Sequence, residues 1–298
     1  MNNFQLVSGV FTAIVTPFLE SGEIDWDSFD KILEHQAKGG VNGVVVCGTT
    51  GESPTITVQE QLALVRRAKA QLPTNIHVMA GCGGSNTQHS VELAKLLSDA
   101  GADSLLVVTP PYNKPSLSGL KAHYKAVSEA TKLGLCLYHV PARTGQLLSS
   151  SDIADICQNE SIVSVKEASG NVALFHDVST KTKQSVLSGD DPTFLASNAV
   201  GGQGVISVVA NVFPKLVVDI QEHSTSGSTN EARRINDILA PFIRSLFIEP
   251  NPCPLKAVMT SMGLCKNVFR LPMVPVSEKS QKIILSEYEA VLTKIESR

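Results

Sequence analysis

Short apolar runs recur eight times along the chain and are rich in β-branched side chains. Their apolar character is almost continuous, which is typical of strands buried on both faces of a parallel sheet. We therefore predict eight strands. The runs are Phe11–Thr16, Gly43–Cys47, Ile76–Ala80, Ser104–Val108, Leu135–Val140, Ile162–Lys166, Ser185–Ser188 and Gly204–Val208.

Amphipathic stretches separate these runs and predict helices. In Thr87–Ala100, apolar residues recur every three or four positions, and Gly101 ends the pattern. Similar patterns cover Asp27–Lys38 and Thr57–Ala70. A strand with its helix takes roughly 20 to 33 residues, which fits a right-handed βαβ crossover. Eight successive units predict an α/β fold of the (β/α)8 TIM-barrel type, and a doubly wound open sheet is the alternative.

The pattern changes after the eighth run, because three helical stretches then follow one another. A cluster of Ser, Thr and Gly at Ser224–Thr229 marks the boundary. We expect the barrel to form a catalytic domain in residues 1–226 and a C-terminal helical region to occupy residues 227–298. The helical stretches are Asn230–Phe247, Pro254–Met262 and Ser277–Ile295.

Composition excludes several classes of partner. The 298 residues have a formal net charge of −3, with charges of both signs scattered along the chain, so we expect no nucleic acid. The longest apolar stretch, Ala199–Val218, is interrupted by polar residues and a proline, so we expect no membrane span. Charged side chains make up 18% of the chain, below the roughly 25% usual for soluble domains. This low fraction favours an oligomer with buried subunit interfaces.

The cysteine and histidine patterns predict neither a metal nor a cofactor. The six cysteines form no CxxC motif, and the seven histidines form no HxH or HxxxH pair. A GxxxxGK[ST] phosphate loop is also absent from the sequence. The first basic residue is Lys31, so the start of the chain resembles neither a signal peptide nor a transit peptide. We expect a cytoplasmic protein with reduced, buried thiols.

Lys166 is the most distinctive candidate for catalysis, because active sites of such barrels lie where strands end. Alternation in this run places Ile162, Ser164 and Lys166 on one face. A lysine in this position either reaches solvent or pairs with a carboxylate. Alternatively, desolvation leaves part of the amine neutral, and the amine then attacks a carbonyl and forms a Schiff base. Sequence position alone leaves both interpretations open.

Other strand ends carry groups that suit the same chemistry. The phenol of Tyr138 can move protons, although a lone tyrosine is more often a core residue. Thr49 and Thr50 can present hydroxyl and N–H groups to a carboxylate, or they form a simple tight turn. Arg143 can clamp a carboxylate with its planar guanidinium, or it is a surface arginine.

Seven motifs in order, from Phe11–Phe18 to Arg270–Met273, give nearly the whole chain a resemblance to a known family. The chain resembles the dihydrodipicolinate synthases, which belong to the pyruvate-dependent class I aldolases. Between these ends, the matching motifs are Gly48–Ser53, Thr109–Pro115, Tyr138–Gly145, Val165–Ala168, Ser188–Asp191, Gly204–Ser207 and Glu249–Pro252.

The resemblance implies a lyase that condenses pyruvate with L-aspartate 4-semialdehyde. The product is 4-hydroxy-tetrahydrodipicolinate, at the first committed step of diaminopimelate and lysine biosynthesis. It further implies that Lys166 forms the Schiff base and that Tyr138 is the general acid and base. Thr49 and Tyr112 would complete a proton relay, with Tyr112 reaching in from a neighbouring subunit.

The resemblance also implies the substrate contacts and the assembly. Thr50 and the backbone of Ile206 would hold the pyruvate carboxylate, and Gly189 would line the same site. Arg143 would position the carboxylate of the semialdehyde. The implied assembly is a homotetramer built as a dimer of dimers.

Two departures from the family pattern affect these expectations. His139 stands where the family commonly has Asn, which leaves the local hydrogen bonding of the following loop open. Ser85, His89 and Pro111 stand where lysine-inhibited members carry an amide, a carboxylate and a tyrosine. We therefore predict weak or absent inhibition by lysine.

Two other functions remain as alternatives. A pyruvate-dependent aldolase acting on a 2-keto-3-deoxy sugar acid would use the same Lys166. A non-catalytic ligand-binding barrel would keep the pocket without turnover, but the complete set of Lys166, Tyr138, Thr49 and Tyr112 argues against it. The Gly-Thr-Thr-Gly turn together with Arg143 distinguishes the chain from N-acetylneuraminate lyases.

Overall fold

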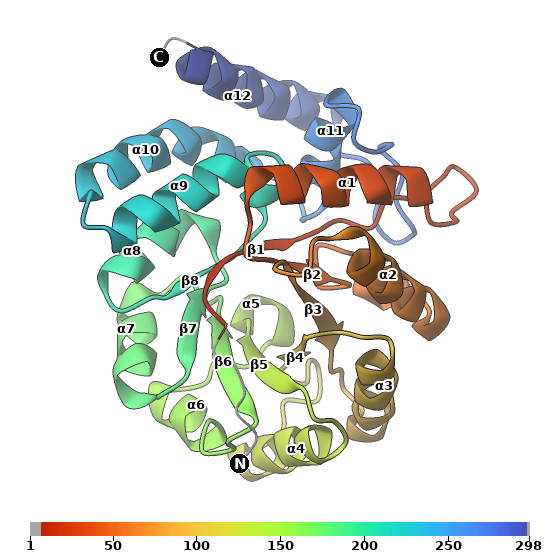
Figure 1. Cartoon of the computed structure of the whole chain (residues 1–298), viewed down its shortest axis with the longest axis vertical. Coiled ribbons are helices and arrows are strands. Elements are labelled where there is room, and N and C mark those ends of the chain that lie inside the picture. Colours follow the sequence, from red (N-terminus) through yellow and green to blue (C-terminus); the bar gives the residue numbers. More distant parts are fainter. Residues whose placement is uncertain (1–6, 297–298) are drawn as a thin grey trace.

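The computed structural model describes residues 7–296, and in it eight parallel strands close into a barrel in sequence order (Figure 1). This architecture confirms the predicted (β/α)8 fold over the open sheet. Residues 1–6 and 297–298 of the two expected regions lie outside the described part. The strands are β1 (Gly9–Ala13), β2 (Gly43–Val46), β3 (His77–Cys82), β4 (Ser104–Val108), β5 (Gly134–His139), β6 (Ile162–Glu167), β7 (Ser185–Ser188) and β8 (Gly204–Ser207).

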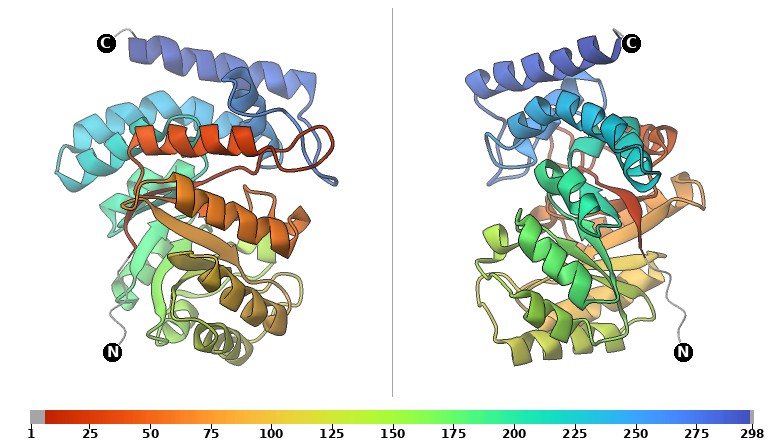
Figure 2. Two further views of the ribbon diagram at one scale, coloured as in Figure 1. Left: turned by 45° about the vertical axis from the view of Figure 1, so that its right-hand side comes forward. Right: turned by 90° about the vertical axis from the view of Figure 1, so that its left-hand side faces the viewer.

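Helices surround the barrel and then continue beyond it (Figures 1 and 2). Helices α10 and α12 pack on one another, and α10 also packs on α9. The first nine helices are α1 (Trp26–Gly39), α2 (Val58–Gln71), α3 (Thr87–Asp99), α4 (Leu117–Glu129), α5 (Pro141–Thr144), α6 (Ser150–Ile156), α7 (Val172–Lys181), α8 (Phe194–Ala199) and α9 (Pro214–Thr225). They are followed by α10 (Thr229–Ser245), α11 (Cys253–Ser261) and α12 (Glu278–Glu296), and three 3-10 turns lie at Ser53–Thr55, Asp191–Thr193 and Val209–Asn211.

Local sequence signals start and stop these helices. At α2, the Thr57 hydroxyl accepts from the Glu60 N–H, and the Glu60 carboxylate accepts from the Thr57 N–H, which forms a capping box. At the end of α1, Gly40 adopts φ +75°, a left-handed conformation that ends helices and that glycine adopts without steric cost. These signals explain why the predicted and observed helix ends differ by only one or two residues.

The apolar residues form two cores, one inside the barrel and one between the strands and the surrounding helices. The inner core includes Phe11, Met79, Leu106 and Ile206. All six cysteines are free and buried, as expected from the absence of paired motifs. Burial raises the pKa of the Cys82 thiol to about 12, so it stays protonated at neutral pH.

The prediction that Ile162 shares a face of β6 with Ser164 and Lys166 is wrong. The pairing of β5 with β6 shifts register between Leu135 and Cys136, so that Leu135 lies opposite Ile162 and Cys136 lies opposite Ser164. This bulge turns Val163 into the inner core and Ile162 into the outer one. Strict alternation therefore fails for Ile162, although Lys166 does face the barrel interior.

The C-terminal region docks on the loop after β2 through buried charges. Lys256 of α11 pairs with Glu52, with 2.5 Å between Nζ and Oε1, and both side chains are at most 2% exposed. The Lys256 Nζ also donates to the Val268 carbonyl at 2.9 Å and lies 4.5 and 4.7 Å from the ring centroids of Phe18 and Phe269. Burial lowers the pKa of Lys256, and the Glu52 carboxylate opposes that shift.

Arg270 makes a second link between the same parts of the chain. Its guanidinium donates to both carboxylate oxygens of Glu60, at 2.9 and 2.5 Å. It also donates to the carbonyls of Gly22 and Thr55. Because a bidentate pair fixes both distance and orientation, Arg270 fixes how the C-terminal region sits on α2.

We predict that Arg270→Gln destabilises the fold in a pH-dependent way. The Arg270 guanidinium, together with hydrogen bonds from the Thr57 N–H and hydroxyl, lowers the pKa of Glu60 from 4.5 to about 2. The pair therefore stabilises the fold fully above the unfolded pKa, and this stabilisation is lost as the pH falls from about 4.5 towards 2. Urea unfolding should show a loss of about 1 kcal/mol at pH 7 and a smaller loss at pH 3.

Arg233→Gln is the matched control, because Arg233 forms an exposed pair with Asp237 at 3.7 Å. We expect this control to leave the free energy of unfolding unchanged at both pH values. An equal loss for Arg270→Gln at pH 7 and pH 3 would contradict the assigned role of Glu60.

Candidate active site

Lys166 and Tyr138 lie opposite one another at the carboxyl ends of β6 and β5. Their Cα atoms are register partners across the two strands. The Lys166 Nζ lies 4.2 Å from the centroid of the Tyr138 ring, and both residues are 6% exposed. The strand pairing thus brings an amine and a phenol together in the barrel interior.

No carboxylate of residues 7–296 lies within 4.0 Å of the Lys166 Nζ. Of the interpretations left open by the sequence, the ion pair and the solvent-exposed lysine therefore do not apply. Schiff-base formation needs a lysine amine that no carboxylate holds, and among residues 7–296 the buried Lys166 amine meets this condition.

Gly189 leaves the space that the Lys166 side chain occupies. A Cβ at position 189 would lie 2.7 Å from the Lys166 Cε, 2.9 Å from its Cγ and 2.6 Å from the Ala168 Cβ. The Gly189 N–H donates to the Glu167 carbonyl at 2.7 Å, so its backbone cannot easily move away. This close approach explains why the residue after β7 is glycine.

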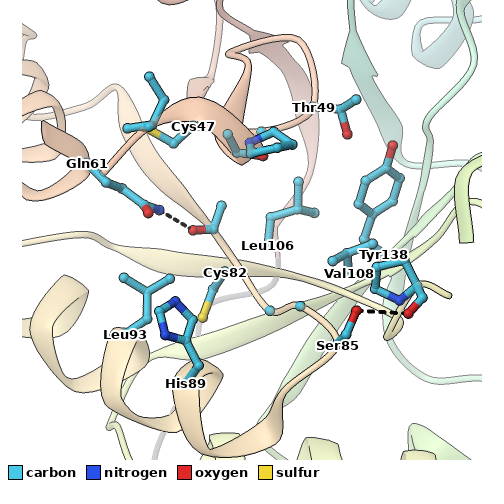
Figure 3. Close-up of a pocket in the computed structure, with 18 of the residues that line it drawn as sticks. Cys47, Thr49, Gln61, Cys82, Ser85, His89, Leu93, Leu106, Val108 and Tyr138 are labelled. Atoms are coloured by element: carbon cyan, nitrogen blue, oxygen red, sulfur yellow. Dashed lines mark hydrogen bonds between the residues drawn. The ribbon is translucent and has the colours of Figure 1, made fainter. Parts of the chain in front are cut away.

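Thr49 and Tyr138 point towards one another across a cavity (Figure 3). Thr49 lies in the turn after β2, where the Gly51 N–H donates to the Gly48 carbonyl at 3.1 Å. Two non-glycine residues flank this turn with positive φ, Cys47 at 54° and Glu52 at 56°. Such strain persists only where surrounding contacts hold it, and here the buried pair of Glu52 with Lys256 supplies them.

Asn251 is a residue near the site that the sequence reasoning did not single out. Its Nδ2 donates to the Thr50 Oγ1 at 3.0 Å, and Thr50 is 3% exposed. The Thr50 oxygen thus accepts from Asn251, and the Thr50 hydroxyl proton remains available for another acceptor. The sequence did mark this segment, because the motif Glu249–Pro252 contributed to the family resemblance. The spacing of the residues could not show that Asn251 contacts Thr50.

The end of β8 supplies a buried structural network beside Ile206. Ile206 is 1% exposed and belongs to the same inner core as Tyr138. Next to it, the Asp191 carboxylate accepts from the Ser207 hydroxyl at 2.5 Å and from the Val208 N–H at 2.8 Å. Burial raises the pKa of Asp191, and these hydrogen bonds oppose that shift. The network fixes the backbone at the end of β8.

Tyr112 and Arg143 are both exposed in the single chain. Tyr112 is 92% exposed and adopts φ +71° in the loop after β4. Arg143 is exposed on α5, directly after β5, and forms no ion pair with the residues that the structure describes. The chain therefore brings together Lys166, Tyr138 and Thr49, while Tyr112 points to solvent.

The cavity that contains Thr49 and Tyr138 extends towards α3 and has a volume of about 330 Å³. Ser85, His89 and Pro111 also line it, and Figure 3 shows Ser85 and His89 there. The Ser85 hydroxyl donates to the Pro111 carbonyl at 2.9 Å. None of the described residues that line it is a carboxylate. The three residues that differ from those of lysine-inhibited members thus share one cavity.

The described part of the chain contains neither a metal-binding cluster nor a candidate membrane span. Between residues 7 and 296, no group of three or more His, Cys, Asp or Glu side chains is arranged to hold a metal ion. In the same part of the chain, no helix has both the length and the apolar character that a membrane span requires.

A closed parallel barrel with a buried lysine beside a tyrosine at its carboxyl end defines a (β/α)8-barrel enzyme. Within that class, the chain belongs to the dihydrodipicolinate synthetase family, whose sequence model matches residues 6–291.

Individual relatives agree with this assignment. The chain is 41% identical over 285 residues to the 4-hydroxy-tetrahydrodipicolinate synthase of Maridesulfovibrio salexigens, covering 95% of this chain and 97% of that one. The crystal structure of dihydrodipicolinate synthase from Thermotoga maritima superposes with a TM-score of 0.94 at 38% identity, covering 96% and 99% of the two chains. The structure of the chloride-inhibited dihydrodipicolinate synthase from Acinetobacter baumannii, complexed with pyruvate, superposes with a TM-score of 0.93 at 36% identity. The match covers 96% of this chain and 99% of that chain.

We predict that Gly189→Ala displaces the Lys166 amine. The added Cβ would lie 2.7 Å from the Lys166 Cε and 2.6 Å from the Ala168 Cβ, so the lysine side chain and the backbone at Ala168 must both shift. A displacement of about 1 Å at a reacting group costs on the order of 100-fold in rate. Borohydride reduction with pyruvate, the ligand of the Acinetobacter baumannii structure, measures how fast Lys166 is labelled.

Gly84→Ala is the matched control, because a Cβ at position 84 meets no atom within 4 Å. It should label Lys166 at the wild-type rate. Equal labelling of the Gly189→Ala variant would show that the space beside Lys166 is not required.

Proposed function

We propose that this protein condenses pyruvate with L-aspartate 4-semialdehyde to give 4-hydroxy-tetrahydrodipicolinate, through a Schiff base on Lys166. The observation that carries the proposal is the buried Lys166 amine, free of carboxylate partners and packed on Tyr138 at the carboxyl end of the barrel. The reaction belongs to the biosynthesis of diaminopimelate and lysine.

The chemistry follows from the amine and the phenol. The Lys166 Nζ adds to the C2 carbonyl of pyruvate, and loss of water from the carbinolamine leaves an iminium. The iminium acidifies the C3 methyl group, and loss of a C3 proton gives an enamine. The enamine carbon then attacks the aldehyde carbon of the semialdehyde. Finally, the amino group of that substrate displaces Lys166 and closes the ring.

Each of these steps moves a proton, and the proposed carrier is the Tyr138 phenol. Thr49 points towards Tyr138 and extends the path for the proton (Figure 3). Tyr112 would complete the relay from a neighbouring subunit, consistent with its 92% exposure in the single chain. We therefore propose a homotetramer, arranged as a dimer of dimers, that works in the cytoplasm.

The proposed substrate contacts use backbone and side-chain donors around Lys166. Thr50, with its hydroxyl oriented by Asn251, and the backbone of Ile206 would hold the pyruvate carboxylate. Gly189 would border the same site. Arg143 would bind the carboxylate of the semialdehyde, a role for which an exposed guanidinium without an ion pair is free.

We expect borohydride to trap pyruvate on Lys166, as a mass adduct that peptide mapping locates. Lys166→Met should abolish the adduct, because it removes the amine that packs on Tyr138. Lys183 is an exposed lysine after α7, and the Lys183→Met variant should retain the adduct. An adduct that persists in Lys166→Met would reject the assignment. Turnover of 2-keto-3-deoxy sugar acids in preference to the semialdehyde would favour the aldolase that the relatives do not support.

We predict that lysine inhibits weakly or not at all. An ammonium side chain needs a carboxylate partner when it is buried, and the described lining of the cavity at Ser85, His89 and Pro111 provides none. The initial rate should fall by less than half at about 1 mM lysine. His89→Glu places a carboxylate in that cavity and should lower the half-inhibitory concentration. Strong inhibition of the wild type would contradict the prediction.

A further inference from the structure

A second buried pair lies on the opposite face of the two strands that carry Lys166 and Tyr138. His139 follows Tyr138 on β5, and Glu167 follows Lys166 on β6. Because neighbouring residues of a strand point to opposite faces, Tyr138 and Lys166 face the barrel interior while His139 and Glu167 face outwards. His139 and Glu167 are also register partners.

The hydrogen bonds of His139 identify its tautomer. The Leu148 N–H donates to the His139 Nε2 at 3.1 Å, so this nitrogen acts as the acceptor and carries no proton. The ring proton is therefore on Nδ1, which donates to the Glu167 Oε1 at 3.0 Å. The Ser169 N–H donates to the same carboxylate oxygen at 3.0 Å. His139 and Glu167 are 0% and 2% exposed.

These contacts connect the strand ends to the loops that follow them. Glu167 holds the start of the loop after β6 through Ser169. His139 holds the far end of the segment that begins directly after β5, at Leu148, nine residues further along the chain. His139 thus anchors the segment that follows Tyr138, and Glu167 anchors the loop that follows Lys166.

The segment between His139 and Leu148 contains α5 and Arg143. At its start, the Arg143 N–H donates to the Val140 carbonyl at 2.9 Å, and the Thr144 hydroxyl donates to the same carbonyl at 3.2 Å. At its end, the hydrogen bond from the Leu148 N–H to His139 holds the segment against the end of β5. Leu148 is only 4% exposed, so water cannot replace the imidazole as acceptor.

We propose that His139 is a positioning residue that fixes the segment carrying Arg143, and that it thereby sets the affinity for the second substrate. The inference rests on the proposed function, because it takes Arg143 as the group that binds the semialdehyde carboxylate. Schiff-base formation with pyruvate requires Lys166 and Tyr138, which lie on the other face of the strands. Loss of the His139–Leu148 contact should therefore affect the two substrates unequally.

Two substitutions separate the two hydrogen bonds of the imidazole. Asparagine places its amide nitrogen near the position of Nδ1, so His139→Asn keeps a donor for Glu167 but leaves the Leu148 N–H without an acceptor. Glutamine reaches one bond further and places its carbonyl oxygen near the position of Nε2. His139→Gln therefore restores the acceptor for Leu148 and serves as the rescue variant.

The experiment compares the wild type, both variants and His176→Asn, an exposed histidine on α7 that serves as control. Steady-state kinetics should show KM for the semialdehyde raised about tenfold in His139→Asn, because a buried donor has lost its partner. The KM for pyruvate and the rate of borohydride trapping should stay within about twofold. His139→Gln should recover most of the affinity, and His176→Asn should match the wild type.

Hydrogen exchange of the peptide that covers residues 140–149 provides a readout that needs no substrate. Exchange should be faster in His139→Asn than in the wild type and should return towards the wild-type rate in His139→Gln. Unchanged exchange together with unchanged KM for the semialdehyde would overturn the proposal. An equal loss of trapping and of semialdehyde affinity would also overturn it, since that pattern indicates general structural damage.

The two hypotheses fail in different ways. A wild-type protein that traps pyruvate but does not consume the semialdehyde overturns the proposed function, and hydrogen exchange alone then decides whether His139 fixes the loop. A wild-type protein that consumes both substrates, with His139→Asn indistinguishable from it, overturns only the role of His139.

Discussion

The parallel hydrogen bonding between β5 and β6 is the constraint on which the site depends. It places Tyr138 opposite Lys166, and one residue further on it places His139 opposite Glu167. A one-residue slip of β6 would turn Lys166 outwards and bring the Glu167 carboxylate beside Tyr138 in the barrel interior. The bulge at Val163 occurs before the paired ends, so the register at the carboxyl ends of the two strands is regular. The same pairing therefore sets both the Lys166–Tyr138 pair and the His139–Glu167 pair behind it.

The C-terminal region contributes to the site although it supplies no barrel strand. Asn251, Lys256 and Arg270 each contact the segment between β2 and α2, which carries Thr49 and Thr50. Breaking a buried ion pair such as that of Lys256 with Glu52 typically costs about 3–5 kcal/mol. A turn with two strained residues is thus held by groups about 200 positions away in the sequence. The distance along the chain says little about which residues build the pocket.

Much of the barrel was predictable from the sequence, since buried parallel strands are almost continuously apolar and helix caps have local signatures. Lys166 stood out in the sequence because a lysine at the end of a buried strand is unusual, whereas Tyr138 alone could equally have been a core residue. The orientation of Ile162 was predicted wrongly, because a bulge depends on the pairing of two strands and leaves no mark in one of them. The partners of His139 and Asn251 depend on long-range packing, and Tyr112 reaches no catalytic group within one chain.

The buried thiols have a consequence for studying the enzyme in solution. All six cysteines are less than 9% exposed, and burial raises the pKa of Cys136 and Cys265 to about 11. The nucleophilic thiolate is therefore scarce at neutral pH throughout the native chain. A cysteine introduced on the exposed surface would react with a maleimide dye far faster than any native thiol. The wild-type background is thus already suited to single-site fluorescent labelling, without removal of its own cysteines.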